Sequence, residues 1–195
     1  MEVQAQIDRE TGAIVREING FTGTYFGYDR NSSLRGDTWK EAFVKIMDSV
    51  LEDGRIKNAN YGFAIGDIRD TILKHASCLE AVTTPQLVHW DAWDLNFFVK
   101  EDRVTCILDI ERALWADPLM EAQFRALSWG SVSENMRGYG KTTFVHEELE
   151  SCHLYTLHLA LVMKTECYDR NYDTDEVSGM AMNLMAPAMK WLQEN

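Results

Sequence analysis

Residues 87–99, LVHWDAWDLNFFV, are apolar at both ends but carry side chains in the middle that are costly to bury. His89 and Asp91 stand two positions apart, and Asn96 follows five positions after Asp91. Asp109 comes at the end of the next apolar run. Phosphoryl transfer needs residues of these types, because a carboxylate orients the attacking hydroxyl and accepts its proton while oxygen ligands hold Mg²⁺ at the phosphates.

The spacing also predicts how these side chains meet. A strand is expected to end at His89, a tight loop to hold Asp91 and Asn96, and a hairpin to return Asp109 to the same edge. Protein kinases have this order: a catalytic aspartate, an asparagine five positions later, and a downstream aspartate that binds metal. By spacing, Asp91 is therefore the expected catalytic base, and Asn96 and Asp109 are the expected Mg²⁺ ligands.

The two segments LVHWDAWDLNFFV and VTCILDIERALWADPLME resemble the aminoglycoside phosphotransferase/choline kinase family, whose kinase-like members act on small molecules. The family pattern is HxDxxxxN, then a hydrophobic strand ending in aspartate, then a Gly/Ala-Asp-Pro turn, and each part is present. The resemblance implies that ATP is the phosphoryl donor, Asp91 the catalytic base, and Asn96 and Asp109 the Mg²⁺ ligands. It further implies that His89 supports the loop and that Glu111 is a secondary candidate near the metal.

The resemblance runs from about residue 12 to the end of the chain and implies a C-terminal lobe alone. Family members begin with a nucleotide-binding lobe that has a Gly-rich loop and a lysine held by a glutamate. Gly20, Gly23 and Gly27 follow no predicted strand, and Lys40 and Lys45 fit an amphipathic helix. We therefore expect the N-terminal nucleotide lobe to be absent, and an exposed apolar face to be covered by a second copy or a partner chain.

Periodicity supplies the elements that would position these residues. Helices are predicted at residues 37–54, 65–82, 118–130, 147–170 and 175–195, the last kinked or split at Pro187; a strand at 86–89 and a hairpin turning at Glu101-Asp102 lie between them. The predicted fold class is mainly α (α+β), a protein-kinase-like C-terminal helical lobe with a short central β-hairpin. Residues 1–195 would form one lobe, with the catalytic loop at 87–99, the metal-binding strand end at 104–111 and substrate-side helices at 118–195.

Composition narrows the function classes. A net charge of -12, from 31 acidic and 19 basic residues, disfavours nucleic-acid binding, which relies on basic surfaces. No apolar run approaches the ~20 residues of a membrane span, and the N-terminus has no apolar core of a signal peptide, so a cytoplasmic location is expected. The four cysteines show no CxxC spacing, which favours free buried thiols over a zinc or redox site.

The sequence defines the substrate class less closely than the reaction. A small molecule with a hydroxyl, cationic or neutral, fits the resemblance. Acidic residues could line a pocket for a cation or form a solvated surface: Glu147, Glu148, Glu150, Asp169, Asp173, Asp175 and Glu176. Trp90 and Trp93 could offer a cation–π surface or pack beneath the loop. The expected function is a small-molecule phosphotransferase; the alternative is a catalytically inactive, truncated remnant that serves as a binding or interaction module.

Overall fold

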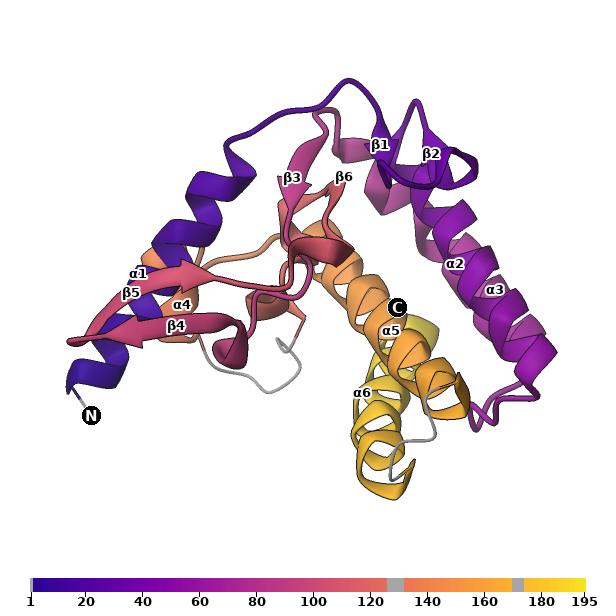
Figure 1. Cartoon of the computed structure of the whole chain (residues 1–195). Helices are drawn as coiled ribbons and strands as arrows, with labels where there is room; N and C mark the ends of the chain where they lie inside the picture. The colour runs from indigo at the N-terminus through magenta and orange to yellow at the C-terminus, as the bar shows by residue number, and fades with distance from the viewer. Residues whose placement is uncertain (1, 126–131, 170–173) are drawn as a thin grey trace.

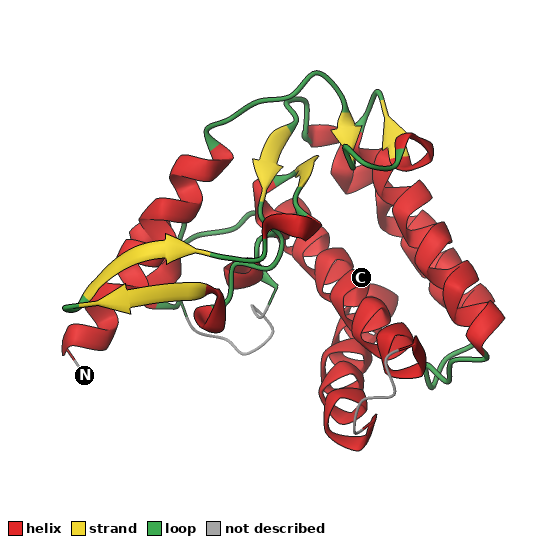
Figure 2. Ribbon diagram, viewed as in Figure 1, coloured by secondary structure: helices red, strands yellow, loops and turns green. Residues whose placement is uncertain are grey.

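The computed structural model describes residues 2–125, 132–169 and 174–195, most of them helical, with two small antiparallel sheets (Figure 2). The helices are α1 (Glu2–Asn19), α2 (Trp39–Lys57), α3 (Ile65–His75), α4 (Glu134–Tyr139), α5 (His146–Asp169) and α6 (Thr174–Glu194). The strands are β1 (Phe26–Gly27), β2 (Arg35–Gly36), β3 (Gln86–Val88), β4 (Phe97–Lys100), β5 (Arg103–Ile107) and β6 (Leu114–Ala116). The predicted α+β class is confirmed.

Helix α2 corresponds to the first predicted helix but runs past Gly54 to Lys57. Gly54 was expected to end it. Its role is instead close packing, because an added Cβ there would stand 1.7 Å from the hydroxyl oxygen of Tyr61. Asn58, in the left-handed conformation with φ 55°, ends the helix, which is a common use of asparagine.

Three other predicted helices differ in their limits. Helix α3 ends at His75 and continues as a 3₁₀ helix to Ala81, where one helix was expected. In place of the helix predicted at 118–130, the described part of that range has two 3₁₀ turns, Pro118–Met120 and Ala122–Phe124, and residues 126–130 lie outside the described ranges. Helix α6 passes through Pro187 without a break. The prediction of a split was wrong because the residues around Pro187 are buried in the core: Met185, Ala188 and Met189.

The larger sheet has the strand order β2-β1-β6-β3, and each neighbouring pair is antiparallel. Of these strands only β3 was predicted. Strands β3 and β6 pair from Gln86 opposite Ala116 to Val88 opposite Leu114. The chain therefore leaves β3 toward the predicted catalytic loop at one end of this pair, and leaves β6 toward Asp117 at the other. Figure 1 shows the pair above α5, between α1 and the α2–α3 pair.

The predicted hairpin is confirmed as β4 and β5, with Phe98 opposite Cys106. Its two-residue turn, Glu101-Asp102, has φ values of 50° and 61°. Positive φ at both central positions is the geometry whose twist suits a tight hairpin. Strand β5 lies against α1, and β4 lies on the outer side (Figure 1).

The main core joins α2, α3, α5 and α6 to β3 and β6. Its largest side chains include Trp39, Phe43 and Tyr155, with the Phe43 ring centroid 5.5 Å from each of the other two. The Trp39 indole N–H donates to the Tyr155 hydroxyl at 2.7 Å, and that hydroxyl donates to Asp117 Oδ2 at 2.7 Å. This chain of hydrogen bonds ties α2 and α5 to the end of β6. No helix of the described residues is long and apolar enough to cross a membrane.

Candidate functional site

Residues 89–96, named here the motif loop, connect β3 to β4 and bring three of the predicted residues together. The side-chain Nδ2 of Asn96 donates to the backbone oxygen of Asp91 at 2.8 Å. The backbone N–H of Leu108 donates to the backbone oxygen of Asn96 at 2.8 Å, which holds the residue before Asp109 against the loop. Asp109 follows two residues after β5, exposed and left-handed with φ 59°. The loop and the strand end therefore form one local unit.

His89 lies at the centre of this unit. Its side chain is fully buried, and its ring nitrogens make no direct hydrogen bond. Burial lowers its pKa, while the nearby backbone of Leu108 and the charges of Asp91 and Asp109 act in the opposite direction. Both carboxylates thus act on the ring electrostatically, and the role of His89 as a support of the loop stays a prediction. Glu111 is exposed, in a 3₁₀ turn after Asp109, and among the described residues no hydrogen bond or ion pair joins it to His89, Asp91, Asn96 or Asp109.

Glu121 anchors the motif loop from behind, a role that the sequence analysis missed. Its buried carboxylate accepts from the backbone N–H of His89 at 2.8 Å and of Trp90 at 3.2 Å, and from Asn19 Nδ2 at 3.0 Å. Burial raises its pKa, and these donors oppose that shift. The available signal was a single acidic residue within the apolar run PLMEAQF, which alone is too weak to identify an anchor.

Trp90 is buried between two arginines of the same chain. The guanidinium carbon of Arg125 lies 4.4 Å and that of Arg112 5.0 Å from its ring centroid. Arg125 Nη2 also donates to the Trp90 backbone oxygen, and burial lowers the Arg125 pKa to about 10. Trp90 therefore packs beneath the loop, and its cation–π partners are internal. Trp93 is 49% exposed, so its side chain is not packed beneath the loop.

The donor set at this site suits magnesium better than zinc. In the ranges that the structure describes, no three His, Cys, Asp or Glu side chains gather to hold a metal. Asn96 Oδ1 accepts no hydrogen bond there and is not closed off from solvent, and the Asp109 carboxylate is exposed. One amide oxygen and one carboxylate fit Mg²⁺, which keeps several waters and takes its remaining ligands from phosphates.

No protein-family model and no curated protein matches this chain. The fold is similar to the crystal structure of a "putative aminoglycoside phosphotransferase" from Ralstonia eutropha JMP134, with a TM-score of 0.63 at 10% sequence identity. The match covers 99% of this chain but 66% of that protein, so this chain spans about two-thirds of its length. At this identity the likeness shows the fold alone, an α+β fold resembling an aminoglycoside phosphotransferase C-terminal lobe.

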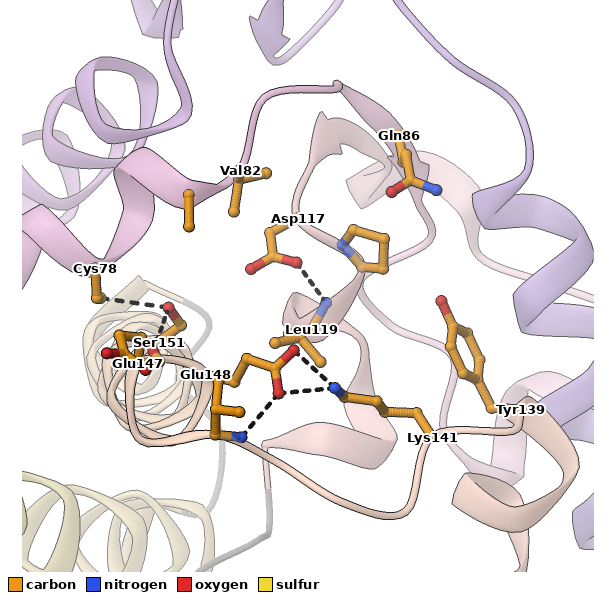
Figure 3. A pocket seen from close by; sticks show the side chains of 13 residues that line it. Cys78, Val82, Gln86, Asp117, Leu119, Tyr139, Lys141, Glu147, Glu148 and Ser151 are labelled. Carbon is orange, nitrogen blue, oxygen red and sulfur yellow. Dashed lines mark hydrogen bonds and ion pairs between the residues drawn. The ribbon is translucent and has the colours of Figure 1, made fainter.

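A separate pocket of about 510 Å³ lies at the other end of β3 and β6 (Figure 3). Glu147 and Glu148 line it, as the acidic-pocket interpretation suggested, but Lys141 Nζ lies 2.7 Å from both oxygens of Glu148. Asp117 also lines the pocket, and burial raises its pKa. The pocket starts at the far end of β3 from the motif loop, so it is not part of the predicted site.

The other acidic candidates are scattered. Glu150 pairs with His75, and Asp175 lies beside Lys164 in a smaller hollow of about 260 Å³. Glu176 is exposed, Asp173 lies outside the described residues, and the Asp169 side chain is not described. The four cysteines are free as expected, but Cys106 is exposed on the hairpin, which corrects the expectation that all four are buried.

Proposed function

We propose that this chain is an ATP-dependent phosphotransferase of the aminoglycoside phosphotransferase type, which transfers the γ-phosphoryl group to a hydroxyl of a small molecule. The motif loop carries the proposal: Asn96 is joined to Asp91 and to the residue before Asp109 by hydrogen bonds of 2.8 Å each. The similarity in fold to the aminoglycoside phosphotransferase structure supports this class of enzyme. It does not favour a cationic substrate over a neutral one. A cytoplasmic location is part of the proposal, because ATP is the donor.

In this proposal each of the predicted site residues has a distinct role. Asp91 orients the substrate hydroxyl and accepts its proton. Asn96 Oδ1 and Asp109 would hold Mg²⁺, which when bound neutralises phosphate charge. His89, whose pKa is lowered by burial, supports the loop from its buried position. Glu111 is a secondary candidate near the metal.

Titration calorimetry with ATP and Mg²⁺ up to millimolar nucleotide tests the metal site. We expect binding that requires Mg²⁺ and that Asp109→Asn weakens by at least ~10-fold, through the loss of a charged ligand. Asparagine tolerates the left-handed conformation of residue 109, so the variant removes charge without strain on the backbone. Asp94→Asn is the matched control, because Asp94 is an exposed carboxylate of the same loop to which we give no role in nucleotide or metal binding.

Release of ADP in the presence of hydroxyl acceptors, including aminoglycosides, choline and sugars, tests the base. Asp91→Asn should keep ATP·Mg²⁺ binding and lose phosphoryl transfer by about 10²–10⁴-fold, the usual contribution of a positioned base. Equal turnover in the variant and the native chain would rule out this role for Asp91.

One observation favours a second candidate, an inactive binding module. The segment 91–111 holds six acidic and two basic residues, and none of those carboxylates has an ion-pair partner in the described ranges. A triphosphate would therefore meet little positive charge from this segment. Calorimetry separates the two candidates, since no detectable heat at millimolar ATP·Mg²⁺ excludes autonomous kinase activity and leaves the binding module.

A further inference from the structure

Large apolar side chains are exposed together around the hairpin. Six of the 13 such side chains in the described ranges lie between residues 93 and 110, each 40% to 73% exposed. We name them the hairpin surface: Trp93, Leu95, Phe98, Val99, Leu108 and Ile110. Apolar side chains exposed singly are ordinary, but a group of this kind within one short segment is typical of an interaction site.

The hairpin also has one open edge. On the β5 side, Glu10 of α1 accepts from the backbone N–H of Val104 at 3.0 Å and from Arg103 Nε at 2.8 Å, so that edge is occupied. Strand β4 pairs only with β5 within the described residues. Its neighbouring residues Phe98 and Val99 are 57% and 44% exposed, so both faces of the strand are open. An edge of this kind is a template for an added strand.

The excess of acidic residues around the open edge of β4 indicates which type of partner would bind there. Of the eight charged residues between 91 and 111, six are acidic, and one of the two basic ones, Arg103, is already paired with Glu10. A second copy of this chain, with its net charge of -12, would bring the same acidic excess to the same edge. Like charges brought together disfavour that pairing, and a basic segment is attracted.

We propose that the outer edge of β4 binds an extended segment of a partner polypeptide in which apolar side chains alternate with lysine or arginine. The backbone of that segment pairs with β4, and its apolar side chains cover the hairpin surface. Its basic side chains lie against the carboxylates on either side of the strand, which include Asp94 and Asp102. The hairpin surface borders Asn96 and Asp109, but the inference is drawn and tested without nucleotide, so its outcome does not depend on whether the chain transfers phosphoryl groups.

Fluorescence anisotropy of labelled synthetic peptides tests the proposal with the whole chain. The probe is a short peptide of alternating lysine and valine, and its comparison peptides alternate glutamate and valine, or replace the central valines of the probe by proline. The lysine peptide should bind, and each comparison peptide should bind about tenfold more weakly or worse, because glutamate is repelled and proline cannot pair as a strand. Equal binding of either comparison peptide would overturn the proposal.

Two variants locate the contact. Phe98→Ser should weaken binding of the lysine peptide by about tenfold, whereas Leu73→Ser should not change it. Leu73 is a matched control, since it is 42% exposed and lies on α3, away from the hairpin (Figure 1). Equal effects of the two variants would contradict the proposed site. Sedimentation velocity adds one further outcome: a dimer that Phe98→Ser abolishes would overturn the basic partner in favour of a second copy.

Discussion

His158, on α5 beneath the motif loop, should make the protein less stable in acid by a calculable amount. Burial, with added repulsion from Arg125 and Arg112, lowers its pKa to about 3. In the unfolded chain a histidine has a pKa of about 6.5. As pH falls below about 6.5, the unfolded chain takes up a proton that the folded chain does not, so stability is lost as pH falls. A pH of about 5 lies roughly 1.5 pH units below the pKa of the histidine in the unfolded chain, and each unit lowers the free energy of unfolding by ~1.36 kcal/mol. The loss of stability at that pH is therefore about 2 kcal/mol.

The assay compares urea unfolding of the native chain and His158→Gln by tryptophan fluorescence, at about pH 8 and about pH 5. Glutamine does not titrate, and its side-chain oxygen can still accept from the Trp90 indole N–H, which lies 3.4 Å from His158 Nδ1. The native chain should lose about 2 kcal/mol more than the variant on acidification. His153, whose pKa burial lowers to about 4, titrates in both proteins and cancels. Parallel losses in the two proteins would refute the reasoning.

The same unfolding assay checks four further substitutions. Glu121→Gln removes an acceptor from one of the buried backbone N–H groups that the carboxylate holds, and should cost about 2–4 kcal/mol; no loss would mean that the loop is anchored elsewhere. Gly12→Ala should cost several kcal/mol, since its Cβ would stand 1.9 Å from a backbone oxygen of α4, whereas Gly66→Ala, with open space around it, should gain up to about 1 kcal/mol. Tyr155→Phe leaves the Trp39 indole N–H without an acceptor and should cost about 1–3 kcal/mol.

The parts of the site that depend on neighbours in sequence could be predicted. Asn96 and Asp91 are five positions apart, and the turn at Glu101-Asp102 brings the second strand back beside the first, with a shift of one residue in the pairing between Phe98 and Val99. Chain length alone then limits how far Asp109 can lie from the loop. For these residues the sequence pattern and the structure agree on position, while their chemistry stays a prediction.

Contacts between distant residues could not be predicted in this way. Glu121 accepts a hydrogen bond from the backbone of His89, more than thirty positions earlier in the chain, and its place in an apolar run is too weak a signal to predict that contact. The burial of Cys106 was predicted wrongly for a related reason: it alternates with apolar residues along its strand, yet that strand belongs to an exposed hairpin. The prediction that the last helix splits at Pro187 was wrong because tertiary packing overrides the local preference of proline for a break.

The buried charged side chains beside the motif loop, Glu121 and Arg125, stabilise an unusual backbone conformation just before Asp91. Trp90 has φ 70°, a left-handed conformation that costs an ordinary residue roughly 1–2 kcal/mol. Its backbone N–H donates to the Glu121 carboxylate and its backbone oxygen accepts from the Arg125 guanidinium. Hydrogen bonds to charged partners contribute about 1.5–3 kcal/mol each, which is comparable to the cost of the conformation. The turn that directs Asp91 is therefore held by the folded chain itself, before any ligand binds.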